Sequence, residues 1–106
     1  MTENVKYEVP RPFRRFTERY PEVADGYQRM GEAVHAWGPL DEKSRALVKL
    51  AISVGARLEG GVHSHARKAR EAGVEPDEIR HAVLLSLPTV GLPSMMAALT
   101  WVEDIL

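Results

Sequence analysis

The spacing of apolar residues is the feature that most constrains the fold of this 106-residue chain. Beyond Asp41, apolar side chains return every three or four positions, which places them on one face of a helix. These are Leu47, Leu50, Ala51, Val54 and Leu58. No segment shows the strict polar and apolar alternation of a half-buried strand. The pattern therefore predicts an all-α fold in which short connections make neighbouring helices pack antiparallel.

Proline and glycine divide the chain into its predicted elements. Residues 1–12 carry two prolines without a helical period, so we expect an extended N-terminal arm there and a single domain over residues 13–106. Gly60 and Gly61 are expected to form a break or a close-packed bend, and Gly73 to cap a helix in the left-handed conformation. Helices are expected over 13–20 and 21–36, after the N-cap Asp41, through His65 to residue 72, from Pro76 to about residue 87, and from about residue 93.

Composition excludes several classes of function. The chain has no cysteine, so it forms no disulfide and performs no thiol chemistry with its own residues. Its net charge of -1 gives no reason to expect nucleic acid or an acidic membrane surface as a partner. No apolar run reaches membrane-spanning length, and no phosphate-binding glycine loop or acidic metal pair is present. We therefore expect a cytoplasmic protein that needs neither a cofactor nor a metal.

His65 is the histidine with the most informative placement. Successive helical residues turn by about 100°, so His65 shares one stripe with small and apolar residues, while His63 points roughly 160° away from it. The stripe consists of Val62, His65, Ala66, Ala69 and Ala72. An imidazole in such a stripe either belongs to the core or lines a pocket, where its proton chemistry suits general acid or base catalysis. Composition alone leaves both roles open.

Other features of the sequence favour structural interpretations. Glu59, His63 and His65 have the spacing of metal ligands, but the two histidines face different ways and cannot easily share one ion. The direction of His81 is not fixed by its helix. Trp37, Trp101 and the methionines at 95 and 96 are expected in the core or at a subunit interface. The apolar run over residues 84–93 is long for an interhelical connection and is typical of an oligomer interface or a pocket wall.

Three pieces of the chain resemble the carboxymuconolactone decarboxylase and alkyl hydroperoxidase D (AhpD)-like family, over roughly residues 40–101. They are Leu40-Asp41-Glu42-Lys43, then His65 to Val74 followed by Pro76-Asp77-Glu78-Ile79, and Gly91-Leu92-Pro93. The resemblance implies a compact helical domain of about five to six helices that assembles into homotrimers or homohexamers. It also implies an active site near His65 and the subunit boundary.

The departures from this family are equally informative. In its AhpD-like branch, two cysteines in a Cys-x-x-Cys arrangement precede the histidine, and the matching positions here are Leu58 and Gly61. A glutamate of that branch matches Ala46. Only His65 carries over, so thiol peroxidase chemistry is impossible, and the chain fits the decarboxylase branch, which needs no cysteine. We therefore expect His65 to transfer a proton during decarboxylation of a small carboxylated lactone.

Arginines near His65 are the candidates for holding substrate carboxylates, and they are Arg45, Arg57 and Arg80. Glu59 is a further candidate, although its helical direction differs from that of His65 by about 120° unless the glycines break the helix. Two alternatives remain open. The domain is either an oligomeric binding or scaffold module that has lost catalysis, or a relative of the antioxidant enzymes by descent alone.

Overall fold

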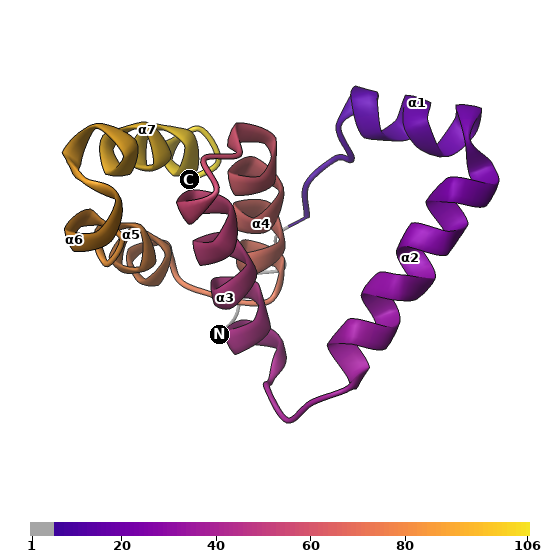
Figure 1. Ribbon diagram of the computed structural model, residues 1–106, viewed down its shortest axis with the longest axis horizontal. Coiled ribbons are helices and arrows are strands. Elements are labelled where there is room, and N and C mark those ends of the chain that lie inside the picture. The colour runs from indigo at the N-terminus through magenta and orange to yellow at the C-terminus, as the bar shows by residue number, and fades with distance from the viewer. Residues whose placement is uncertain (1–5) are drawn as a thin grey trace. The chain divides into compact units, whose positions relative to one another are not determined.

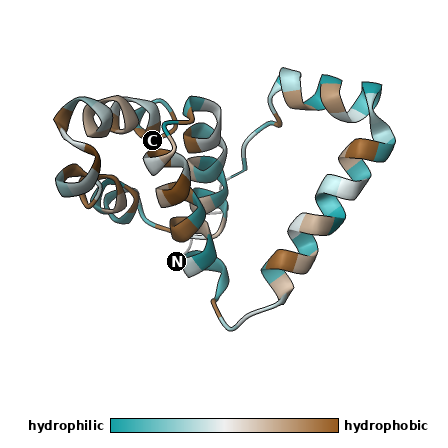
Figure 2. Ribbon diagram, viewed as in Figure 1, coloured by the Kyte–Doolittle hydropathy of each residue, from teal (hydrophilic) through white to brown (hydrophobic). Residues whose placement is uncertain are grey.

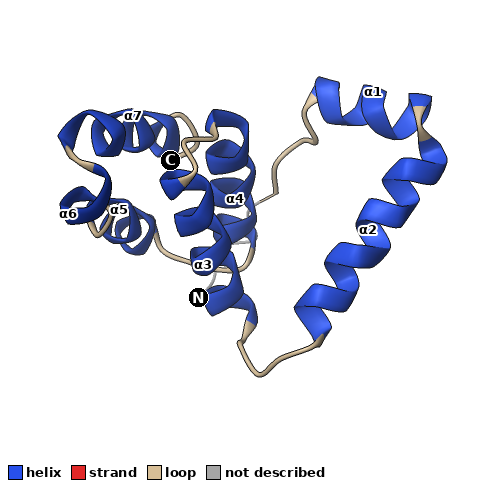
Figure 3. Cartoon of the chain, in the orientation of Figure 1, coloured by secondary structure: helices blue, strands red, loops and turns tan. Residues whose placement is uncertain are grey.

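The computed structural model describes residues 6–106, and every regular element in this range is a helix (Figures 1 and 3). Their bounds are α1 Arg11–Arg19, α2 Pro21–Ala36, α3 Glu42–Gly55, α4 Glu59–Glu71, α5 Pro76–Leu84, α6 Leu87–Val90 and α7 Leu92–Glu103. The prediction of an all-α fold is thus confirmed for the described residues. The helix predicted to run to about residue 87 ends earlier, and the single turn α6 follows it before Gly91, whose φ is 87°.

The chain forms two compact units, residues 7–40 with α1 and α2, and residues 41–106 with α3 to α7. The single domain expected over residues 13–106 stays a prediction.

The expected N-terminal arm falls partly outside the described residues. Within them, residues 6–10 are not helical, but α1 begins at Arg11 and not after residue 12. This correction has a simple cause, because Pro12 lies in the first helical turn, where its missing N–H has no intrahelical partner to lose.

The third helix begins at the cap predicted for it. Asp41 Oδ1 accepts a hydrogen bond from the backbone N–H of Ser44 at 2.8 Å, which satisfies one of the free donors of the first turn. This bond is the main reason why the pKa of Asp41 lies below its usual range. The cap thereby fixes where α3 starts and which face it buries.

The break between α3 and α4 lies before the two glycines and not at them. Arg57 takes the left-handed conformation with φ of 60°, and the N–H of Leu58 donates to the carbonyl of Ser53 at 3.0 Å. This is the C-terminal motif usually completed by glycine. Gly60 and Gly61 therefore lie in the first turn of α4. The expectation was wrong because the left-handed residue is an arginine, for which the sequence carries no signal.

The end of α4 follows the prediction. Gly73 has a φ of 88°, and the N–H of Val74 donates to the carbonyl of Ala69 at 2.9 Å. Val74 is completely buried, which supplies the apolar contact that accompanies this motif. The motif turns the chain sharply between α4 and α5.

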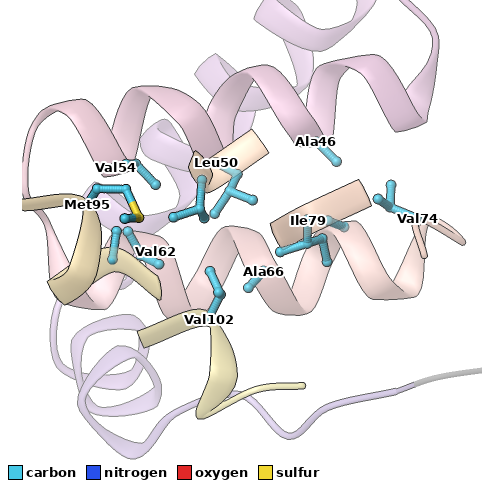
Figure 4. Close-up of a cluster of buried hydrophobic side chains, with 12 residues drawn as sticks. Ala46, Leu50, Val54, Val62, Ala66, Val74, Ile79, Met95 and Val102 are labelled. Atoms are coloured by element: carbon cyan, nitrogen blue, oxygen red, sulfur yellow. The ribbon is translucent and has the colours of Figure 1, made fainter. Parts of the chain in front are cut away.

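Residues 41–106 share one apolar core, which α3, α4, α5 and α7 enclose (Figure 4). α3 and α4 run antiparallel, with Ala46 and Val74 at one end of the core and Val54 and Val62 at the other. The core consists of Ala46, Leu50, Val54, Val62, Ala66, Ala69, Val74, Ile79, Val83, Met95, Ala98 and Val102. Leu58, which the periodicity places on the apolar face of its helix, is 55% exposed. Met96, expected in the core or at a subunit interface, is 47% exposed.

Along the ribbon, α2 and α3 both carry apolar positions spaced between polar ones (Figure 2). In α3, the apolar Leu50 and Val54 belong to the core. Among the helices that the structure describes, none is both long enough and apolar enough to cross a bilayer.

Candidate functional site

His65 lies on the flank of the buried stripe of α4. Val62, Ala66 and Ala69 are completely buried, while His65 is half-buried. The predicted stripe is therefore present in the structure. His65 is neither sealed in the core nor fully solvated, which is a setting in which an imidazole can meet a ligand from solvent.

Three cationic side chains of α3 and α4 lie close enough to one another for their charges to interact, and we call Arg45, Lys49 and Lys68 the basic edge. Lys49 follows Arg45 by four residues on α3, and Lys68 follows His65 by three on α4, so each pair shares a helix face. Desolvation of the half-buried Lys49 lowers the pKa of its ammonium, and the charges of Lys68 and Arg45 lower it further. The two helices thus bring like charges together, and one of these charges, Lys68, follows His65 by one helical turn. Such an arrangement favours binding of an anion.

Arg57 and Glu59 lie away from the basic edge. Both are exposed at the connection between α3 and α4. Twelve residues separate Arg45 from Arg57, which is roughly 18 Å along a helix. Glu59 precedes His65 by six residues, or about 9 Å of helical rise. Since the helix is unbroken from Glu59 onward, the condition under which Glu59 would turn toward His65 is not met.

Arg80 is engaged in an ion-pair network at the junction of α5 and α7. Its Nε donates to Glu103 Oε2 at 2.8 Å and its Nη2 to Glu103 Oε1 at 3.0 Å. Its Nη1 donates to Asp77 Oδ1 at 2.9 Å. These bonds, first with Glu103 and then with Asp77, raise the pKa of Arg80, and the bond with Arg80 lowers the pKa of Glu103. A substrate carboxylate would have to displace a bidentate partner.

His63, the other histidine of α4, pairs with Asp104, which follows α7. His63 Nε2 and Asp104 Oδ2 lie 2.9 Å apart, and the His63 side chain is 23% exposed. This pair joins α4 to the residue after α7, which is a structural role. His81 is exposed on α5. In the described part of the chain, no three His, Asp or Glu side chains gather in a way that could hold a metal ion.

Three positions match the cysteines and the glutamate of the AhpD-like branch, and here they carry two apolar residues and a glycine. Ala46 belongs to the core. Gly61 packs so closely on α3 that an added Cβ would lie 2.8 Å from Ser53 Oγ. Leu58 is exposed. No carboxylate or thiol stands at any of these three positions.

Lys49 and Lys68 were missed in the sequence analysis. Lys49 follows Arg45 by four residues and Lys68 follows His65 by three, so each lysine shares a helix face with a residue already named as a candidate. Only the packing of α3 on α4 shows that the two lysines lie near each other. The helical period gives directions within one helix and says nothing about how two helices face each other.

The sequence model of the carboxymuconolactone decarboxylase family matches residues 21–104. The match extends the resemblance to residues 21–39, which include α2. An uncharacterised protein of Haemophilus influenzae (strain ATCC 51907 / DSM 11121 / KW20 / Rd) is 34% identical over 61 residues, which make up 58% of this chain and 54% of that protein. The chain thus spans about half the length of this curated relative.

Proposed function

We propose that this chain, which belongs to the carboxymuconolactone decarboxylase family, decarboxylates a small carboxylated lactone with His65 as the proton-transfer residue. The single observation that carries the proposal is the half-buried His65 one helical turn before Lys68, whose charge interacts with that of Lys49. Because the basic edge concentrates positive charge, a carboxylated ligand is the chemical class that fits it. The proposed reaction takes place in the cytoplasm and requires no cofactor.

The chemistry uses residues of α3 and α4 only. Arg45 and Lys49 bind a substrate carboxylate and orient the ring toward His65. The bond between the ring carbon and the departing carboxylate breaks, carbon dioxide leaves, and the electron pair enters the conjugated system as a dienolate. The imidazolium of His65 then donates its proton to carbon, and solvent returns a proton to His65. Neighbouring cations stabilise the negative charge of the dienolate as it forms.

The second candidate function is a binding or scaffold module without catalysis. Ala46 favours it, because this position lies in the core and offers no carboxylate for proton relay. The commitment of Arg80 to Glu103 and Asp77 points the same way. An antioxidant role by descent would require a thiol from another protein, since this chain contains no cysteine.

The test is release of carbon dioxide from carboxylated lactones. We expect turnover by the wild-type protein, a loss of roughly 100-fold or more for His65→Gln, and a raised KM for Lys49→Gln. His81→Gln is the matched control because it removes an exposed histidine of the same unit, and it should retain full activity. Full turnover by His65→Gln would refute the assignment of the proton-transfer residue.

A binding measurement separates the two candidate functions. We would titrate the protein with glutarate and follow the ring nitrogens of His65 by NMR. Shifts that disappear in Lys49→Gln, together with turnover, support the enzyme. Neither shifts nor carbon dioxide release would leave the scaffold as the function of this domain.

A further inference from the structure

Lys49 has surroundings that set it apart from an ordinary surface lysine. The chain has four lysines, which are Lys6, Lys43, Lys49 and Lys68. Lys43 lies on the same helix six residues earlier and is exposed, whereas Lys49 is half-buried. The next residue, Leu50, is completely buried in the core, so the aliphatic stem of Lys49 begins at the margin of that core. Partial burial of an ammonium group favours its neutral form, because the charge loses contact with water.

The other two cations of the basic edge act on the same amine. Arg45 precedes Lys49 by one turn of α3, and Lys68 lies on α4, which packs on α3. All three residues belong to the unit of residues 41–106. Desolvation holds the pKa of Lys49 below its ordinary 10.5, and the charges of Lys68 and Arg45 lower it further. At neutral pH, a larger share of Lys49 than of an exposed lysine is therefore the nucleophilic neutral amine.

The charges of the basic edge also determine which product of this amine is favoured. A neutral lysine forms a cationic adduct with a carbonyl compound, as a protonated imine, or an anionic adduct with carbon dioxide, as a carbamate. A cationic adduct at Lys49 is repelled by Arg45 and Lys68. An anionic adduct is attracted by both, and it can accept charge-assisted hydrogen bonds from them. The cluster therefore favours conversion of the Lys49 amine into an anion.

We propose that Nζ of Lys49 reacts with dissolved carbon dioxide to form a carbamate, which Arg45 and Lys68 stabilise. The lone pair of the amine attacks the carbon of carbon dioxide, an N–C bond forms, and one C=O electron pair moves onto oxygen. The nitrogen then releases one proton to solvent, so neither an oxidant nor a reductant is needed. The reverse step restores the amine and carbon dioxide. Because the reagent is present in solution, the proposal does not depend on the decarboxylation of a lactone.

Chemical trapping in the wild-type protein tests whether the carbamate forms at Lys49. The protein is incubated with isotope-labelled bicarbonate at neutral pH and treated with triethyloxonium ion, which ethylates a carbamate to a stable ester. Mass spectrometry then locates the labelled ester among the four lysines. We expect the ester at Lys49 to exceed that at Lys43 on the order of tenfold, because more of the Lys49 amine is neutral. Equal modification of these two lysines, or none at Lys49, would overturn the proposal.

Variants that remove charge test the role of the neighbouring cations. Arg45→Gln combined with Lys68→Gln should reduce trapping at Lys49 to the extent seen at Lys43, because the amine regains its proton and the carbamate loses its partners. Arg67→Gln is the matched control, since it removes a cation from the position next to Lys68 on α4, and it should be trapped like the wild type. Circular dichroism checks that the variants keep their helices. Unchanged trapping at Lys49 in the double variant would overturn the proposal.

Discussion

At the scale of single residues, Gly61 shows how closely α3 and α4 approach. An added Cβ at Gly61 would lie 2.8 Å from Ser53 Oγ, 3.2 Å from Ser53 Cβ and 3.3 Å from Leu58 Cβ. Ser53 is only 5% exposed, so its side chain has little space into which to move. A cysteine at this position, as in the AhpD-like branch, would meet the same obstacle. The close packing of α3 on α4 is therefore a physical reason why position 61 carries glycine and not cysteine.

Two neighbouring glycines allow this to be tested with a matched pair. We expect Gly61→Ala to lower the free energy of unfolding by about 1 to 3 kcal/mol because of overpacking. Gly60→Ala should raise it by about 0.5 kcal/mol, since nothing lies within 4 Å of its Cβ and alanine favours the helix. Urea denaturation measures both.

The double variant Ser53→Ala with Gly61→Ala removes the hydroxyl that causes the shortest contact, and part of the lost stability should return. If Gly61→Ala proves as stable as Gly60→Ala, the close approach of α3 and α4 at this point is not rigid.

At the scale of elements, local signals predicted helix ends better than they predicted buried faces. Pro21 and Gly73 mark a start and an end where the structure has them. The end of α3 was missed because Arg57 adopts a conformation that favours glycine. Met96 was expected in the core or at a subunit interface, and it lies outside the core of this chain, because the burial of a helix face depends on which neighbours cover it. The basic edge was missed for the same reason.

The network of Arg80 makes the attachment of α7 to α5 depend on pH. The pKa of Glu103 is lowered from its ordinary 4.5 by the hydrogen bond with Arg80. A carboxylate with a depressed pKa in the folded state stabilises the fold above its ordinary pKa, and this stability is lost as the pH falls through the folded value. We therefore expect the melting temperature to fall in acid, below about pH 4.5, and to fall less steeply in Glu103→Gln.

The control for this measurement is Glu18→Gln, which removes an exposed carboxylate of α1. Its melting temperature should depend on pH as that of the wild type does. If the melting temperatures of Glu103→Gln and the wild type fall equally steeply in acid, the bond between Glu103 and Arg80 contributes nothing to stability. High salt should weaken the effect, because the network is exposed to solvent.

At the scale of the whole molecule, the unit of residues 41–106 has an exposed apolar surface. The run over residues 84–93 leaves Leu84, Leu85 and Leu92 exposed by 48, 66 and 57%. An apolar run of this length is typical of an oligomer interface or a pocket wall, and self-association stays a prediction.

The two assembly sizes implied by the family resemblance, trimer and hexamer, differ in symmetry. A trimeric ring has a single three-fold axis, whereas a hexamer of two trimers adds two-fold axes, across which each copy presents the same surface. We expect a mass of about 35 kDa for a trimer or about 71 kDa for a hexamer in light scattering, three or six times the 11.8 kDa of one chain. A stable monomer at micromolar concentration would contradict self-association, because the apolar run over residues 84–93 would then stay exposed without a subunit to cover it.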